Sequence, residues 1–295
     1  MEHTKVFEDF KRDFSFQSEL SESIAILEGG KGFRAKFIAL LSSIFDIKET
    51  ESNVISDATE SLHTATLVHD DVIDNAQMRR GKTSLNNVID NKKSILLGDY
   101  YLAKTIQKIS ELNRVELVHS ISGVLSSLVE GEWLQAGITK SDWSMQTYKE
   151  VAIHKTGSIF SWCLQSVMMV KFGNIEHQLI DKIGNEIGLL FQIVDDYLDF
   201  KGEDKTLLAD LKNGNINYFL LKMKEMGLST EESKIKESLS VIMSEVEEEI
   251  ENLKDSILSD FKELLKLPEV NLSSAERINM FNFFLEQLAS RYKSN

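Results

Sequence analysis

A single proline, Pro268, occurs among the 295 residues of the chain. Proline is frequent in loops and at the edges of β-sheets, whereas long helices joined by short turns can do without it. Apolar residues also recur at steps of three and four over long stretches, which is the spacing of a helix with one buried face. The sequence therefore predicts an all-α fold. No internal repeat, low-complexity linker or change of composition marks a boundary, so residues 1–295 are predicted to form a single all-helical domain.

Stretches with helical spacing account for most of the sequence. Glycine-rich or polar breaks separate them, and Ser274 stands where it can cap the N-terminus of the last one. Residues 201–217 have little apolar periodicity and are predicted to be mostly loop. The predicted helices are 15–27, 33–45, 52–74, 95–109, 115–133, 148–172, 177–200, 233–267 (as one or two helices) and 275–292.

The composition excludes several classes of protein. One cysteine, Cys163, cannot form an internal disulfide, and a hydrophobic share of 42% is too high for a disordered chain. A net charge of -14 argues against a nucleic-acid partner, which would need a basic surface. No apolar run reaches the roughly 18 residues of a membrane span, and the N-terminus carries charges where a signal peptide is apolar. We therefore expect a cytoplasmic protein.

Two segments carry the same pattern of aspartates: Asp70, Asp71 and Asp74 in HDDVID, and Asp195, Asp196 and Asp199 in VDDYLDF. Each triplet ends an apolar helical stretch, and chance is a poor explanation for two copies in one chain. Residues four apart share a helix face, so the outer two carboxylates of each triplet repel each other. A hard divalent cation relieves this repulsion. Carboxylates that leave coordination positions open suit Mg²⁺ bridging a phosphate-bearing ligand.

Two other interpretations of the triplets stay open. Each could be a charged helix end without a ligand. A calcium-binding loop is a weaker rival, because the spacing lacks the alternating oxygen ligands and the central glycine of that motif. The duplication favours Mg²⁺ with a diphosphate over both.

Basic residues near the triplets could hold the phosphate oxygens of such a ligand. Arginine suits bidentate phosphate contacts, and lysine supplies a point charge. Each one taken alone is as easily a surface charge, and only the placement beside the triplets and the glycine breaks singles them out. The candidates are Arg79 and Arg80 after the first triplet, Lys31 and Arg34 in GGKGFRAKF, Lys155 in HKTGSIF, and Lys205 after the second triplet.

The order of these motifs resembles that of the trans-polyprenyl diphosphate synthases, which elongate isoprenoid chains head to tail. GGKGFRAKF, HTATLVHDDVIDNAQMRRGKTS, LLGDYYLA, EGEWLQ, HKTGSIF and FQIVDDYLDF follow one another as in that family. The similarity covers about residues 29–214, and DDxxD followed by MRRG is highly specific. The chain looks more like the long-chain, octaprenyl-type branch than the farnesyl branch. The resemblance implies an all-α bundle around a deep central cavity, usually a homodimer, with Mg²⁺ as cofactor.

The resemblance also implies roles for individual residues. Asp70, Asp74 and Asp195 would ligate Mg²⁺, with Asp71, Asp196 and Asp199 in or near its coordination shell. The allylic diphosphate would be held by Arg79, Lys155 and Lys205, and the diphosphate of isopentenyl diphosphate by Lys31, Arg34, His63 and Arg80. Thr156 and Gln192 would present oxygens toward the developing cation. For His63, a structural, buried histidine is the alternative, and His69 has no implied role.

The implied reaction joins isopentenyl diphosphate to an allylic diphosphate, farnesyl or geranylgeranyl. Mg²⁺ and the basic side chains would neutralise the charge that builds on the leaving diphosphate, so that the allylic C–O bond ionises in an apolar cavity. No side-chain nucleophile is required, which leaves Cys163 as a small core residue. In this family, bulky residues four and five positions before the first aspartate form the floor of the product tunnel. Thr66 and Ala65 are small, which predicts a product longer than that of a geranylgeranyl synthase.

Two segments depart from the family pattern. Gly32 and Ala35 stand where a basic residue and a proline are usual, and LADLKNGNINYFLL replaces a segment usually read as GxDLxxGKPTLP. The altered residues 215–219 are the best support for an alternative, a non-catalytic or regulatory subunit of a heteromeric synthase. A terpene cyclase and a shorter-chain geranylgeranyl synthase are further alternatives. A long product would also favour transient association with a membrane for its release.

Overall fold

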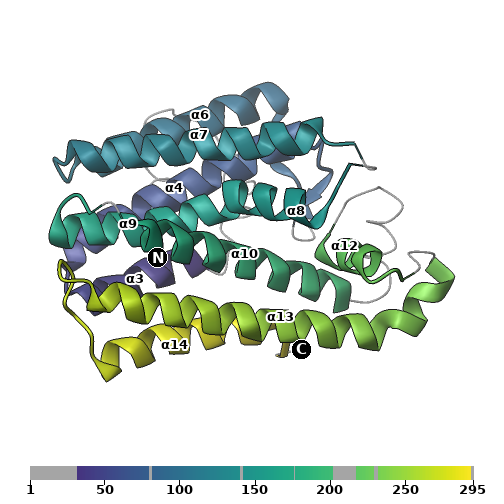
Figure 1. Cartoon of the computed structure of the whole chain (residues 1–295). Coiled ribbons are helices and arrows are strands. Elements are labelled where there is room, and N and C mark those ends of the chain that lie inside the picture. The colour runs from purple at the N-terminus through teal and green to yellow at the C-terminus, as the bar shows by residue number, and fades with distance from the viewer. Residues whose placement is uncertain are drawn as a thin grey trace. The chain divides into compact units, whose positions relative to one another are not determined.

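A computed structural model describes residues 32–79, 82–139, 142–175, 177–201, 217–228 and 232–293. Most of these residues are helical, and the only strands among them form one short hairpin, which confirms the predicted all-α fold (Figure 1). They fall into two compact units. The first comprises the described residues up to Ile121 with Met169–Lys171, and the second comprises Ser122–Met168 with those from Phe172 onward. That the whole chain is one domain stays a prediction.

The first unit is built on α4, which packs along α6 and against α3. The buried residues of α4 recur every three or four positions, from Ile55 through Leu62 to Val68, so the helix has one apolar face to bury. Ala65 and Val68 share a core cluster with Leu97 and Tyr101 of α6. The elements are α3 (Phe33–Phe45), α4 (Glu49–Ile73), β1 (Met78–Arg79), β2 (Lys82–Thr83), α5 (Leu85–Ile89), α6 (Asn91–Ser110) and the start of α7 (Val115–Gly137).

The second unit is built on α10 (Gln178–Lys201), which contacts α8, α12, α13, α14 and a π-helix. Its largest buried side chains include Trp162, Phe219 and a stacked pair, Phe261 with Phe281, whose ring centroids are 3.7 Å apart. The other elements are α8 (Met145–Ala152), the π-helix (Ile153–Gly157), α9 (Ser158–Phe172, apart from the residues of the first unit), α12 (Tyr218–Glu225), α13 (Glu232–Lys266), α14 (Ala275–Ala289) and a 3₁₀ turn (Ser290–Lys293).

Most of the predicted helices are confirmed, in places to the residue. The helix predicted over 33–45 has those bounds, 233–267 is one helix, and the backbone N–H of Arg277 donates to the capping hydroxyl of Ser274 at 3.2 Å. Cys163 is fully buried. The segment predicted as one helix over 148–172 was wrong in detail, because a π-helix interrupts it at Ile153–Gly157. The helix predicted over 15–27 and most of the predicted loop over 201–217 lie outside the described residues.

The short elements between the motifs were not predicted. The β1–β2 hairpin, α5 and α12 span too few residues for an apolar period to show. Across the described residues, no helix is both long enough and apolar enough to cross a bilayer.

Candidate active site

The first aspartate triplet lies at the C-terminal end of α4, and its middle residue is buried. Asp71 continues the buried stripe of α4, three positions after Val68, and is 1% exposed. Asp70 is half-buried, and Asp74, the C-cap, is exposed. The helical period therefore turns Asp71 away from the face that Asp70 and Asp74 share.

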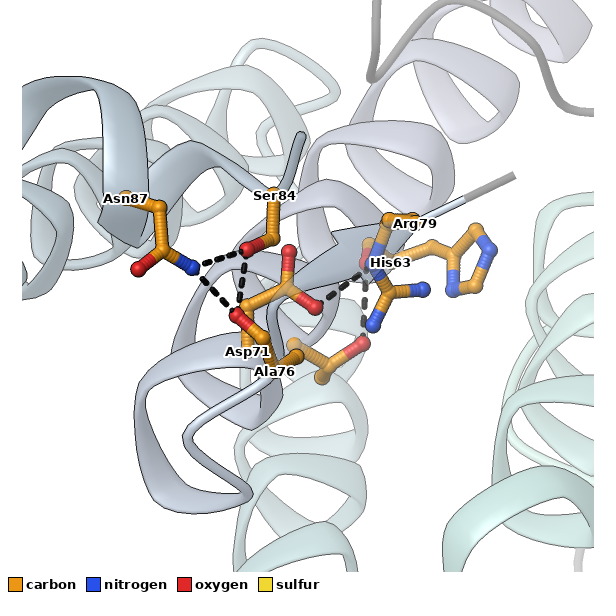
Figure 2. Close-up of polar contacts among 7 residues, drawn as sticks. His63, Asp71, Ala76, Arg79, Ser84 and Asn87 are labelled. Carbon is orange, nitrogen blue, oxygen red and sulfur yellow. Dashed lines mark hydrogen bonds and ion pairs between the residues drawn. The ribbon is translucent and has the colours of Figure 1, made fainter. Parts of the chain in front are cut away.

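Asp71 is bound by the arginine that the sequence assigns to the allylic diphosphate. The Nε–H of Arg79 donates to Oδ1 of Asp71 at 2.7 Å (Figure 2). Within the described residues, Oδ2 of Asp71 is buried and has no hydrogen-bond partner. Since Asp71 accepts only from Nε, this contact orients the guanidinium and leaves its Nη groups outside the bond.

The turn that carries Arg79 is itself fixed by hydrogen bonds. The carbonyl of Ala76 accepts from the hydroxyl of Ser84 and from the side-chain amide of Asn87, the latter at 2.6 Å (Figure 2). The backbone N–H of Ser84 donates to Gln77 at 3.1 Å, and Arg79 pairs with Lys82 across the hairpin. The hairpin thus folds back beside the end of α4.

His69 and Gly98 join the end of α4 to α6. Nε2 of His69 lies 3.1 Å from the carbonyl oxygen of Ile95 and 3.5 Å from Oδ1 of Asp99. A Cβ at Gly98 would stand 2.1 Å from that nitrogen, so only glycine leaves room for the ring. The glycine of LLGDYYLA thereby lets the histidine just before the first triplet pack against α6.

Of the other described residues predicted for substrate binding and product length in this unit, three are half-buried and Ala65 is fully buried. His63 and Arg34 are half-buried, and the hydroxyl of Thr66 donates to the carbonyl of His63 at 2.8 Å. Ala65 is fully buried in the α4–α6 core. Lys31 and Arg80 lie outside the described residues.

The second triplet lies near the end of α10, and its middle residue is again the most buried. Asp196 is 8% exposed, while the side chain of Asp195 is 35% exposed and Asp199 is exposed. Oδ2 of Asp196 accepts from the hydroxyl of Tyr148 at 2.7 Å and from the backbone N–H of Tyr218 at 2.8 Å. Oδ1 accepts from Nε2 of Gln192 at 3.0 Å. Burial raises the pKa of Asp196 to about 6, against the opposing effect of these hydrogen bonds.

Gln192 and Lys155, both predicted to act on the substrate, already have protein partners. Gln192 directs its amide N–H₂ to Asp196. Nζ of Lys155 lies 2.5 Å from Oε2 of Glu132 and donates to Oε1 of Gln135 at 3.0 Å. Glu132 and Gln135 belong to the EGEWLQ motif, so that motif holds the lysine of HKTGSIF. Lys205 lies outside the described residues.

Lys155 and Thr156 are carried by the π-helix, which packs closely on α10. A Cβ at Gly188 would stand 2.3 Å from Cα of Gly157, and a Cβ at Gly184 would stand 2.1 Å from Cα of Ser161. These two glycines lie four residues apart on one face of α10, where they let the backbones approach. Such π-turns within α-helices are often found at functional sites.

Sequence reasoning missed Arg291, in the final 3₁₀ turn. Its guanidinium forms an ion pair with Oδ1 of Asp195 and lies 4.6 Å from the ring centroid of Phe191. Phe191 and Asp195 are four residues apart on α10 and present one surface to the arginine. No sequence signal connects residues 96 positions apart.

The chemistry of the donors fits a divalent metal bound together with an oxygen-rich ligand. Among the described residues, no three His, Cys, Asp or Glu side chains form a metal-binding group by themselves. Carboxylate oxygens are the ligands of Mg²⁺, which is often held by one or two carboxylates and completed by substrate phosphates and water. In the first unit Asp70 is half-buried and Asp74 is exposed, and in the second unit the side chain of Asp195 is 35% exposed, so each unit offers carboxylate oxygens of this kind.

Comparison with known proteins agrees with this chemistry. The polyprenyl synthetase family model matches residues 18–257. A prenyl transferase of Cyanidium caldarium is 29% identical over 94% of this chain and 90% of its own length. Solanesyl diphosphate synthase 3 of Arabidopsis thaliana is 31% identical, over 63% of this chain and only 50% of that protein. The crystal structure of a decaprenyl diphosphate synthase from Rhodobacter capsulatus has the same fold, with a TM-score of 0.78 at 21% identity over 98% of this chain and 96% of that one. The family match covers most of the chain, and the chain therefore belongs to the polyprenyl synthetase family of prenyltransferases.

Proposed function

We propose that the protein condenses isopentenyl diphosphate with farnesyl or geranylgeranyl diphosphate to make a long, all-trans polyprenyl diphosphate of octaprenyl-like length. The observation that carries this proposal is the shared design of the two triplets. At the end of α4 and near the end of α10, one aspartate is buried and bound by the protein, while its neighbours are more exposed. The small Thr66 and the likeness to a solanesyl diphosphate synthase support a long product, whereas Ala65 packs in the α4–α6 core.

In this proposal Asp70, Asp74 and Asp195 hold Mg²⁺, which, when bound, supplies positive charge against the leaving diphosphate. Asp71, Asp196 and Asp199 lie near these ligands in the chain. Arg79, oriented by Asp71, offers its Nη groups to the allylic diphosphate. Lys155 does the same from the π-helix, and Lys205 is proposed as a third cation.

The remaining roles follow the predicted set. Lys31, Arg34, His63 and Arg80 bind the diphosphate of isopentenyl diphosphate, and Thr156 lies beside the reacting allylic carbon. Gln192 can present its amide oxygen there while its N–H₂ stays on Asp196. A homodimer, a cytoplasmic location and transient membrane association during product release remain parts of the proposal.

The test is incorporation of label by the purified chain. It is incubated with Mg²⁺, farnesyl diphosphate and radiolabelled isopentenyl diphosphate, and the dephosphorylated products are sized by reversed-phase chromatography. We expect products beyond about twenty carbons, lost in Asp70→Ala and Asp195→Ala, since oriented charge supplies most of the catalysis. Products that stop at geranylgeranyl length would favour the shorter-chain synthase. A chain that binds metal and diphosphate but incorporates nothing would favour the non-catalytic subunit.

Product length has its own test at Thr66. A phenylalanine at Ala65 would collide with a packed core and confuse overpacking with a shortened tunnel. Thr66 is only half-buried, so Thr66→Phe is the cleaner change and should shorten the longest product. Thr66→Val, which removes the hydroxyl but keeps the volume, is the matched control and should leave product length unchanged. An unaltered product from Thr66→Phe would contradict the proposed floor.

A further inference from the structure

We propose that Asp196 is a positioning residue, which ties α8 and the start of α12 to α10, and that it is not a ligand of the metal. The inference rests on the proposed function of the second triplet. It assigns to Asp196 a role different from that of Asp195 beside it.

Protein donors already occupy the carboxylate of Asp196. Both oxygens of Asp196 are engaged by protein donors, Oδ2 by the Tyr148 hydroxyl and the Tyr218 backbone N–H, and Oδ1 by Gln192. The residue is 8% exposed, whereas the side chain of Asp195 is 35% exposed. A metal on Asp196 would have to displace buried donors, and a buried donor that loses its partner is costly. Asp195 is more exposed, and a metal there would share the carboxylate with Arg291.

Two of these donors come from elements other than α10. Tyr148 lies on α8, which continues directly into the π-helix that carries Lys155 and Thr156. Tyr218 begins α12, immediately after Asn217, whose side chain caps that helix by accepting from the N–H of Leu220 at 3.0 Å. One carboxylate therefore fixes both elements to α10.

One donor, Tyr218, belongs to the segment of the sequence that departs from the family pattern. Residues 217–219 fall where the family pattern is lost, yet Asn217, Tyr218 and Phe219 are all buried. The ring of Tyr218 packs on that of Tyr148 with centroids 5.5 Å apart, and its hydroxyl is bound to Glu249 of α13. Residues 217–219 thus have packing and hydrogen-bond contacts of their own, one of them with Asp196.

The experiment compares three variants of the full chain. Asp195→Asn tests the proposed metal ligand. Asp196→Asn keeps the shape and an acceptor for Tyr148 and Tyr218, and the amide of Gln192 can turn to suit it. Tyr148→Phe removes only one donor from α8 and leaves both aspartates in place, so it still tests the tie if Asp196→Asn fails to fold.

Two measurements separate the roles. Mn²⁺ binding without diphosphate, followed by electron paramagnetic resonance, should weaken several-fold more in Asp195→Asn, which loses a proposed ligand, than in either of the other two variants, where at most an outer-shell contact is changed. Amide hydrogen exchange of α8 should become faster in Tyr148→Phe, because its tie to α10 is cut. With the substrates, Tyr148→Phe should raise the KM for the allylic diphosphate more than it lowers kcat, since Lys155 is displaced.

Equal losses of Mn²⁺ affinity in Asp196→Asn and Asp195→Asn would overturn the proposal, as would unchanged exchange of α8 in Tyr148→Phe. If Asp195→Asn binds Mn²⁺ normally while α8 loosens in Tyr148→Phe, the metal assignment of the proposed function fails and the tie through Asp196 stands. Neither binding nor exchange requires the chain to be active.

Discussion

At the scale of single residues, the charge next to each proposed metal ligand decides how strongly that ligand can act. Arg291 is 11% exposed and neutralises Asp195 while packing on Phe191. A divalent cation that binds Asp195 must share it with this guanidinium. If Asp195 is a metal ligand, as proposed, the ion pair lowers the affinity of the free protein for the metal.

We expect Arg291→Met to tighten Mn²⁺ binding several-fold, because methionine keeps apolar contact with Phe191 but removes the competing charge. The lost ion pair and ring contact should lower the free energy of unfolding by about 1 kcal/mol. Calorimetric titration of the metal measures the first effect and denaturant unfolding the second. The same substitution in an Asp195→Asn background is the control. If tightening persists there, it reflects the general field of the protein and not this pair.

Single residues also show what the sequence could and could not predict. The burial of Asp71 could be predicted from the sequence, because Asp71 follows Val68 by three residues on the apolar face of α4. The partners of Asp195 and Asp196 were not, since Arg291 and Tyr148 lie 96 and 48 positions away and meet them only through tertiary packing. Sequence spacing predicts the helix face on which a side chain lies. Its partners from distant parts of the sequence are known only from the tertiary structure.

At the scale of elements, close packing of the π-helix on α10 controls where Lys155 and Thr156 lie. The apolar periodicity over 148–172 correctly predicted helix but did not predict the π-helix. A π-turn holds one more residue than an α-helical turn, and the residue types in it need not differ. The close packing of the π-helix and the following residues on α10 depends on Gly184 and Gly188, which have no side chain to separate the backbones.

Gly188→Ala should displace this turn, because the new Cβ would stand 2.3 Å from backbone of Gly157, which cannot simply rotate away. We expect kcat/KM to fall about 10-fold or more, since a shift of about 1 Å can cost 100-fold, and stability to fall by about 1–3 kcal/mol. Gly123→Ala on α7 is the matched control, because a Cβ there meets nothing within 4 Å. It should gain up to about 1 kcal/mol in stability. Normal kinetics in Gly188→Ala would contradict the positioning role of the π-helix.

The contact of α10 with α13 contains a carboxylate whose ionisation opposes folding. Burial raises the pKa of Glu186, although Lys182 opposes the shift, and Oε2 of Glu186 is buried without a hydrogen-bond partner among the described residues. A raised pKa means that the folded state holds this proton more tightly than the unfolded state. The contribution of Glu186 to stability is therefore best at low pH and is lost as pH rises through the raised value.

Glu186→Gln should accordingly be more stable than the parent at neutral pH, where the parent must ionise a half-buried group. The difference between the two unfolding midpoints should shrink as pH falls from the raised pKa of Glu186 toward the ordinary glutamate value of 4.5, and should change little below that value. Denaturant unfolding in a series of buffers measures it. A difference that grows on acidification would reverse the assigned sign. Lys182→Met is a control for the neighbouring charge, because it removes the opposing cation and should enlarge the benefit of Glu186→Gln.

At the scale of the whole molecule, each compact unit carries one aspartate triplet on its own long helix. The sequence predicted this duplication and the all-α fold, because both depend on local patterns, the spacing of the aspartates and the apolar periodicity. It predicted nothing of the two units, which follow from tertiary contacts. The proposed reaction requires that both triplets act on one substrate diphosphate, and this requirement has a kinetic consequence.

Groups that act as one catalytic assembly are not additive when removed. If both triplets serve one ionisation step, Asp70→Ala already removes most of what the assembly supplies, and adding Asp195→Ala should cost little more. We expect the loss of kcat/KM in the double variant to lie within about 10-fold of the larger single loss, far from the product of the two. Single-turnover incorporation of labelled isopentenyl diphosphate measures all three variants. Losses that multiply would mean that the triplets act on separate steps. A pair of exposed aspartates away from the triplets, such as Asp142 and Asp255, replaced in the same way gives the reference for independent sites, where small effects should simply add.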